Sequence, residues 1–250
     1  MKNKYLISFF LLILFYQNLL NAEIFKIESS KIKILEKGNI IKATNDVKII
    51  SNDGIEITGN ELIYNKKKAI LKILGNVILD DKRNNIITKG EEYIYFKNEE
   101  KIKIFGNVTL NDKNNDIVTQ GEEFIYFRNE EKILSVGKSQ SNIKNNYYLE
   151  SDDLIYDRNL SEVYSDKRTK IKDSENNIFT TDKFKLNFTT DLLKAKNLSL
   201  FDNKKNQYYL SFALVNLKDN KFLGSDISID FEDGLFGNNE NNPRLKGNSL

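Results

Sequence analysis

Pairs of adjacent carboxylates recur along the chain. Glu91-Glu92, Glu122-Glu123 and Asp152-Asp153 could supply the two acids that general acid–base catalysis uses. The chain has no His and no Cys, so the commonest general base, the thiol nucleophile and the usual zinc ligands are absent from the sequence. An active site is needed once, whereas these pairs repeat at a regular interval. We therefore interpret them as exposed strand-edge charges and predict neither enzymatic activity nor catalytic residues.

Clusters of Asp and Asn at residues 80–85 and 111–116 are the second candidate site. Ca²⁺ prefers oxygen ligands, but the clusters lack the alternate-position spacing and the fixed bidentate Glu of an EF-hand loop. Asn and Asp tolerate left-handed backbone and are typical of tight turns. We expect turns here, with no metal and no cofactor.

These features follow an internal repeat of about 31 residues. Residues 76–106, NVILDDKRNNIITKGEEYIYFKNEEKIKIFG, align without gaps on residues 107–137, NVTLNDKNNDIVTQGEEFIYFRNEEKILSVG. An earlier copy begins near Asp46, and the register continues at Ser151 and Thr181, which makes about five units. A repeat of this length indicates stacked structural units, each of which contacts its neighbours.

Apolar residues alternate with polar ones within each unit, as in Ile102-Lys103-Ile104. This period of two predicts about two short strands per unit and essentially no helix. Stacking would bury equivalent apolar residues in one continuous interior, as core, ligand site or both. A register slip of one residue would bury Ile63, Ile94 and Ile125 instead. The predicted interior residues are Val47, Ile49, Ile55, Ile57, Leu62, Tyr64, Val77, Leu79, Ile86, Thr88, Tyr93, Tyr95, Val108, Leu110, Ile117, Thr119, Phe124 and Tyr126.

Residues 1–22 have the layout of a secretory signal peptide. Lys2 and Lys4 precede an apolar run, and we expect cleavage after Ala22. The run is shorter than the roughly 20 residues of a membrane span, so an uncleaved anchor is the alternative. Removing these residues leaves 36 basic against 36 acidic residues. A formally neutral chain has no net electrostatic field that would attract nucleic acid, so we do not expect nucleic-acid binding. Without Cys it forms no disulfides, and its stability depends on strand pairing and apolar burial.

The strand of pattern glycine-acid-acid-aromatic-Ile-Tyr between Gly75-Asn76-Val77 and Gly106-Asn107-Val108 resembles the organic solvent tolerance (OstA-like) repeat of the lipopolysaccharide-transport proteins LptA, LptC and LptD. The resemblance covers about residues 27–215. It implies an open β-jellyroll, or β-taco, that carries lipopolysaccharide through the periplasm with acyl chains inside and sugars outside. The predicted interior residues would then line a lipid groove. It also implies that LptA-like domains dock by strand addition at the first edge, near Phe25 to Ile34.

The tail from Gly224 to Gly247 resembles the stretch that joins the periplasmic domain of LptD to its barrel. We therefore expect a signal peptide at 1–22, a jellyroll at 23–223 and a linker at 224–250 toward a barrel that this chain lacks. This describes the periplasmic domain of an LptD-like assembly protein at the outer membrane, with an outer-membrane lipoprotein as a further partner. The alternatives are a soluble LptA-like periplasmic bridge, a closed β-solenoid surface or structural protein with a dry core, and a β-helical polysaccharide lyase that uses carboxylates with Lys or Arg.

Overall fold

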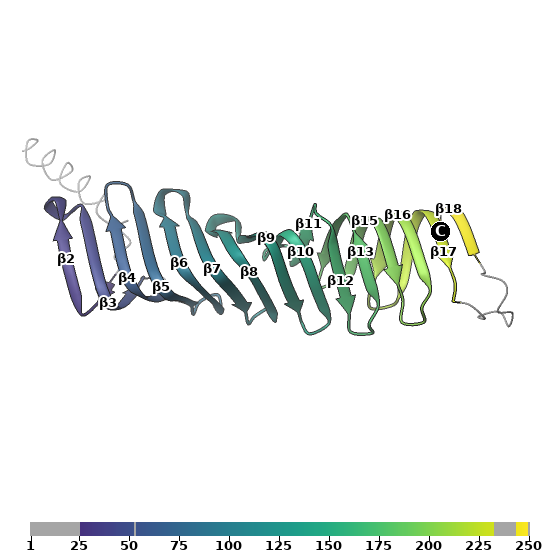
Figure 1. The fold of residues 1–250 in the computed structure, drawn as a ribbon, viewed down its shortest axis with the longest axis horizontal. Helices are drawn as coiled ribbons and strands as arrows, with labels where there is room; N and C mark the ends of the chain where they lie inside the picture. The colour runs from purple at the N-terminus through teal and green to yellow at the C-terminus, as the bar shows by residue number, and fades with distance from the viewer. Residues whose placement is uncertain (1–25, 53, 233–243, 250) are drawn as a thin grey trace, which may run out of the picture.

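The chain forms one long antiparallel β-sheet. The computed structural model describes residues 26–52, 54–232 and 244–249, and their 18 strands join in a single sheet that runs along the molecule in chain order (Figure 1). The predicted fold class, an all-β jellyroll of stacked antiparallel strands, is confirmed, while the signal peptide lies outside the described residues. The strands are β1 (Lys26–Glu28), β2 (Lys31–Leu35), β3 (Ile40–Ile50), β4 (Ile55–Asn65), β5 (Ile70–Asp81), β6 (Ile86–Phe96), β7 (Lys101–Asp112), β8 (Ile117–Phe127), β9 (Lys132–Ile143), β10 (Tyr147–Asp157), β11 (Glu162–Ser165), β12 (Thr169–Asp173), β13 (Ile178–Thr181), β14 (Lys183–Asn187), β15 (Leu192–Phe201), β16 (Gln207–Asn216), β17 (Lys221–Asp230) and β18 (Arg244–Ser249).

The alternation predicted short strands, but most strands of the sheet are long. β3 to β10 each contain 11 or 12 residues. A β-bulge in the middle of each pair shifts the register, for example between Leu74 and Val77 of β5 where it pairs with β6. A bulge absorbs the extra residue without ending the ladder, so two predicted short strands become one bent strand. The helical segments of the described chain are three short 3-10 turns, η1 (Glu36–Gly38), η2 (Lys97–Glu99) and η3 (Arg128–Glu130).

The bulges lie at the same level in successive strands and bend the sheet along one line, the corner. Gly75 and Asn76 have positive φ angles of 81° and 49°, and Gly106 and Asn107 have 81° and 46°. Glycine adopts this left-handed region without a steric penalty, and asparagine tolerates it. The glycine-asparagine pairs of the repeat therefore mark where β5 and β7 turn.

The corner divides the sheet into two faces. β10 shows the division directly, because Ile155–Asp157 pair with β11 while Tyr147–Ser151 pair with β12. We call the side that holds β11 and β14 the first face, and the side that holds β12 and β13 the second face. The inner sides share one hydrophobic core cluster. Tyr208 of the second face meets Phe222 of the first face with ring centroids 5.6 Å apart.

Two rows of turns lie at the ends of the strands farthest from the corner. Turns were predicted at residues 80–85 and 111–116, and the structure has them at 82–85 and 113–116, with Asn85 and Asp116 in the left-handed region at φ 54° and 52°. Asp81 stabilises its turn by accepting a hydrogen bond of 3.0 Å from the Asn84 amide. The first row joins strands of the first face and includes residues 66–69, 97–100, 128–131 and 158–161, and the second row includes residues 82–85, 113–116 and 144–146.

The sheet continues into the C-terminal part of the chain. β17 crosses the domain boundary expected at residue 224, and β18 pairs with it between Ser225↔Ser249 and Asp230↔Arg244. Much of the segment expected to be a linker is therefore part of the sheet. Within the described residues, no helix has the length and apolar character needed to cross a membrane.

The corner predicts a difference between two neighbouring residues. A Cβ at Gly90 would lie 2.9 Å from Ile104 Cγ2 and 3.0 Å from the Phe105 carbonyl oxygen, which is backbone and cannot move aside. We expect Gly90→Ala to lower the free energy of unfolding by about 2 kcal/mol, measured by urea titration.

Lys89→Ala is the matched control, because Lys89 is the exposed neighbour of Gly90 on the same strand. Its stability should change by less than about 0.5 kcal/mol. Equal losses in the two variants would refute the packing explanation.

Candidate functional site

The interior between the two faces holds the residues that the repeat placed inside. Of the 16 predicted interior residues other than Thr88 and Thr119, 12 are buried and the other four, Ile55, Ile57, Tyr64 and Tyr126, are half-buried and pack against the core. Thr88 and Thr119 are also buried. The buried set is Val47, Ile49, Leu62, Val77, Leu79, Ile86, Tyr93, Tyr95, Val108, Leu110, Ile117 and Phe124.

The alternative register does not occur. Ile63, Ile94 and Ile125 are half-buried and lie outside the core cluster. Ile94 pairs across strands with Lys72 and Lys103, whose positions belong to the outer side of the first face. The inner pattern shifts phase at the bulge of β6, where Gly90 is buried and the next buried residue is Tyr93.

The apolar interior extends past the predicted columns into the second half of the sheet. The less regular repeats there gave no alignment from which to name residues, although their alternation continues. The additional buried apolar residues include Leu149, Leu154, Tyr156, Val163, Ile171, Phe179, Phe184, Leu186, Leu193, Leu198 and Leu210.

The interior is closely packed. Two internal hollows have volumes of about 30 Å³ and about 10 Å³, and a cavity needs roughly 10–15 Å³ by this measure to hold one water molecule. Neither hollow has room for a long apolar guest.

The two faces approach each other again along the seam, the line between the two rows of turns opposite the corner. Arg158, at the start of a first-row turn, donates from Nε to Asp112 Oδ2 at 2.9 Å and also contacts Glu131. Tyr156 Oη donates to the same Asp112 oxygen at 2.7 Å, and Asn115 Nδ2 donates to it at 3.0 Å. These residues, which we call the Arg158 network, connect the second-face end of β7 to the first face.

Burial and charge act in opposite directions within the Arg158 network. The Asp112 side chain is 0% exposed, which by itself raises its pKa, but hydrogen bonds from Asn115, Tyr156 and Arg158 outweigh burial and hold the pKa below its usual value. Burial and the neighbouring Asp112 carboxylate raise the pKa of Tyr156. Asp112 is therefore a carboxylate and Tyr156 a neutral donor at neutral pH.

Further bridges cross the seam in the second half of the molecule. Tyr147 Oη donates to Asp191 Oδ1 at 2.9 Å, and Lys144 Nζ donates to the Phe188 carbonyl oxygen at 2.8 Å. Both bridges join the second-face row of turns to the first-face row, so the seam is closed there by polar contacts.

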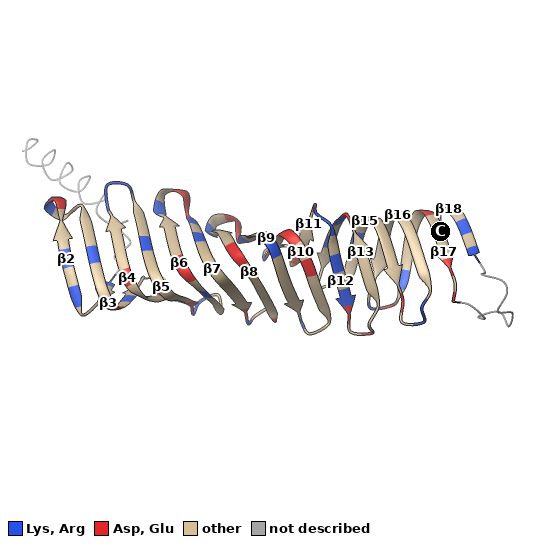
Figure 2. Ribbon diagram, in the orientation of Figure 1, with Lys and Arg blue, Asp and Glu red and all other residues tan. Residues whose placement is uncertain are grey.

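The carboxylate pairs do not converge on a site. Figure 2 shows basic and acidic bands alternating from β5 to β8, and Lys72 contacts Glu92 across strands at 2.8 Å. Asp153 accepts a hydrogen bond of 2.9 Å from the Gly137 amide at a bulge. The pairs thus stabilise the outer surface and the corner.

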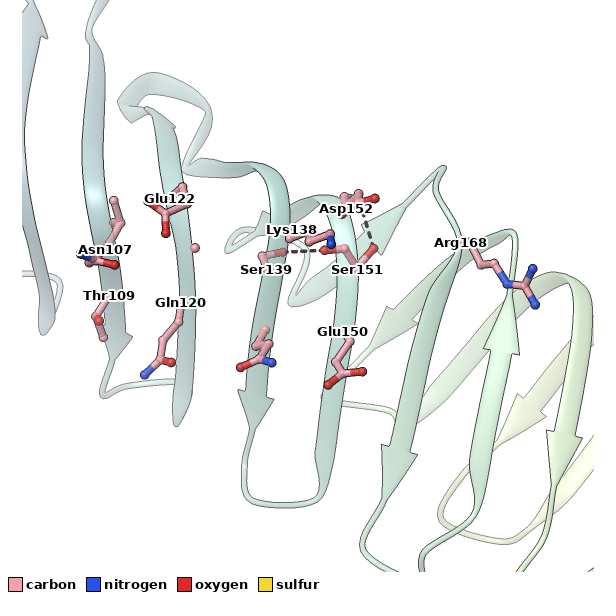
Figure 3. Close-up of a pocket in the computed structure, with 13 residues that line it drawn as sticks. Asn107, Thr109, Gln120, Glu122, Lys138, Ser139, Glu150, Ser151, Asp152 and Arg168 are labelled. Atoms are coloured by element: carbon pink, nitrogen blue, oxygen red, sulfur yellow. Dashed lines mark hydrogen bonds between the residues drawn. The ribbon is translucent and has the colours of Figure 1, made fainter.

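A polar hollow of about 640 Å³ lies on the outer side of the sheet over β7 to β10 (Figure 3). Glu122 of β8 and Asp152 of β10 come from separate strands, with Lys138 of β9 between them. Its lining also includes Thr109, Gln120, Gln140, Glu150 and Arg168.

One family model matches part of the chain. Residues 16–95 match the model of the OstA-like protein family, so the OstA-like resemblance is confirmed over that part of the chain. No curated protein matches the sequence. The structure is similar to LptH of Pseudomonas aeruginosa, described as the LptA-homologous periplasmic component of a lipopolysaccharide transport device, with 14% identity, TM-score 0.41 and coverage of 46% of this chain and 82% of that one. The TCP10 domain of Danio rerio CPAP matches with 12% identity, TM-score 0.14 and coverage of 66% and 92%.

The Arg158 network predicts a pH-dependent contribution to stability. Asp112→Asn removes the charge that Arg158 and Tyr156 share, and we expect a loss of about 3 kcal/mol at pH 7 in urea unfolding. Because the pKa of Asp112 is lowered by folding, its contribution is present above its unfolded pKa of about 4 and disappears as the pH falls through the folded pKa.

Asp116→Asn is the control, since Asp116 is exposed in the neighbouring turn. It should change stability by less than about 0.5 kcal/mol at any pH. A difference between wild type and Asp112→Asn that stays constant from pH 7 to pH 3 would contradict the assignment.

Proposed function

We propose that this OstA-like chain binds lipopolysaccharide by its acyl chains and conducts it through the periplasm to the outer membrane. The observation that supports this most is the continuous apolar interior, in which equivalent residues of successive repeats lie in columns along the sheet. Burying one methylene is worth about 0.8 kcal/mol, so holding several acyl chains in water costs tens of kcal/mol. An apolar path along the molecule offsets that cost at every step.

The proposal requires the two faces to separate, because the internal hollows are small. Acyl chains would replace contacts between the faces with contacts of the same apolar kind. The corner would act as the hinge line, since strand pairing on each face can persist while the seam opens.

Within the OstA-like family we assign the chain to the LptD-like type, as a periplasmic domain associated with the outer membrane. The resemblance of the tail after Gly224 supports this assignment. An outer-membrane lipoprotein is then its expected further partner. A soluble LptA-like bridge is the alternative within the same function.

A closed β-solenoid with a structural role is the second candidate function. The close packing of the interior and the polar bridges along the seam favour it. Titration of the folded chain with lipid A separates the two functions, because a permanently closed core shows no saturable uptake.

The first edge of the sheet is the proposed docking site for an LptA-like domain, near Phe25 to Ile34. β1 and β2 pair with the two halves of β3, so each of them is the edge strand of one face at this end of the sheet. Ile32 and Ile34 of β2 are 46% and 68% exposed. A strand from a partner would extend the ladder and cover these apolar side chains.

Photo-crosslinking tests the lipid path. A photoreactive residue in place of the buried Phe124 should capture lipopolysaccharide in cells, whereas the same residue in place of its neighbour Ile125 should capture none. The comparison is sharp because the two side chains lie on opposite sides of one strand. Capture at Ile125 alone, or protein crosslinks only at Phe124, would contradict the proposal.

A charge at the first edge tests docking. Ile34→Asp should weaken binding of a purified LptA-like domain by about tenfold, because it replaces an exposed apolar side chain with a charge that the interface would have to bury. Its own stability should change by less than about 0.5 kcal/mol.

Leu223→Asp is the matched control at the opposite end of the sheet, where Leu223 is 62% exposed. Biolayer interferometry would measure both variants. Equal weakening by both would show that the first edge is not the docking site.

A further inference from the structure

The seam contains a polar hollow of about 220 Å³, which we call the seam hollow. It lies directly before the Arg158 network in the repeat order, and Glu131 belongs to both. Residues from the two rows of turns and from the adjoining strand ends line it, so it is a gap between the faces. They are Asp81, Arg83 and Asn84 on the second-face side, and Glu100, Tyr126, Arg128, Asn129 and Glu131 on the first-face side.

An apolar hollow, the inner hollow, adjoins it inside. Arg128 lines both hollows, and Tyr95 and Ile102 line the inner one. Among its other lining residues are Ile49, Ile55, Ile57 and Leu79. The polar seam hollow at the surface suits the head group of an amphiphile, and the apolar inner hollow that adjoins it suits the tail.

Arg128 holds Tyr95 in place at this junction. Its guanidinium donates to Glu100 Oε2 at 2.8 Å and to Tyr95 Oη at 3.1 Å, and lies 5.7 Å from the centre of the Tyr95 ring. Tyr95 Oη in turn donates to Glu100 Oε1 at 2.8 Å. A group that drew Arg128 outward would remove two of the contacts that fix the Tyr95 ring.

Two arginines, Arg83 and Arg128, and three carboxylates line the seam hollow, and an anion would contact the arginines. The three carboxylates already have partners: Asp81 accepts from Asn84, Glu100 from Arg128, and Glu131 from Arg158. Arg83 is exposed and has no side-chain hydrogen bond or ion pair among the described residues. An arginine pair is well suited to a phosphate or carboxylate, because the guanidinium presents donors that match their oxygens.

We propose that an anionic amphiphile is admitted through the seam hollow, with its head group between Arg83 and Arg128 and its tail passing Tyr95 into the inner hollow. The head group replaces Glu100 on Arg128, and the released Tyr95 ring opens the way inward. This inference rests on the proposed function and specifies where on this chain its cargo enters.

Binding of simple amphiphiles to the purified chain, measured by calorimetry below micelle-forming concentrations, tests the site. Dodecyl phosphate should bind about tenfold more tightly than dodecyl maltoside, which has the same tail and a neutral head. Dodecanoate distinguishes a carboxylate head from a phosphate head. Inorganic phosphate alone should bind more weakly than dodecyl phosphate, because it gains nothing from the inner hollow.

Variants locate the site. Arg83→Gln and Arg128→Gln should each weaken dodecyl phosphate binding by about tenfold, and Arg83→Gln should leave dodecyl maltoside binding unchanged. Arg168→Gln, in the outer polar hollow, is the control and should change neither. Glu100→Gln should strengthen dodecyl phosphate binding, since the anion no longer displaces a carboxylate. Because a gain in affinity cannot come from poor folding, Glu100→Gln keeps the test valid if Arg128→Gln is poorly folded. Arg83 is exposed, so Arg83→Gln should remain folded.

The inference is wrong if wild type binds dodecyl phosphate and dodecyl maltoside with equal affinity. It is also wrong if Arg83→Gln leaves dodecyl phosphate binding unchanged and Glu100→Gln does not strengthen it. The proposed function fails separately. Suppose that the photoreactive residue in place of Phe124 captures lipopolysaccharide equally fast in the otherwise wild-type chain and in the Arg83→Gln, Arg128→Gln double variant. The inference is then wrong and the proposed function stands. If wild type captures none, the function is wrong whatever the amphiphiles do.

Discussion

The alignment of β-bulges in one line is the constraint on which the rest of the structure depends. Each strand must bend at the same level for the two faces to oppose each other, and a slip of one residue in any strand would turn its apolar side chains outward. The Gly-Asn pairs at 75–76 and 106–107 supply the left-handed backbone that the bend needs. Gly90 supplies the space, because the neighbouring strand's backbone lies against it.

Bending brings together two kinds of surface with different physics. Near the corner the faces bury apolar side chains, which stabilise the closed form along its whole length. At the seam the turns bring charges and hydroxyls together, and these must be satisfied when water is excluded. Asp112 meets that requirement through Asn115, Tyr156 and Arg158, so that a fully buried carboxylate remains charged.

The seam therefore differs from the corner in how it can open. Polar contacts between turns can be exchanged for contacts with a charged ligand, whereas the backbone ladders at the corner have no such substitute. The proposed admission of an anionic amphiphile beside Arg128 uses this difference. Farther along, the Tyr147 and Lys144 bridges hold the faces together around an interior that would have to part for cargo to move on.

The repeat in the sequence determined the fold class, the positions of the turns and the interior residues, because residues one period apart occupy equivalent places on a stacked sheet. Only the structure revealed the strand lengths and the phase shift between Gly90 and Tyr93. Strand pairing continues through a bulge, whereas the alternation of apolar residues is interrupted there and suggests that the strand ends. The Arg158 network was also invisible in the sequence. Tyr156 lies 44 residues from Asp112, in another unit, and the two meet because the bent sheet returns one row of turns to the other.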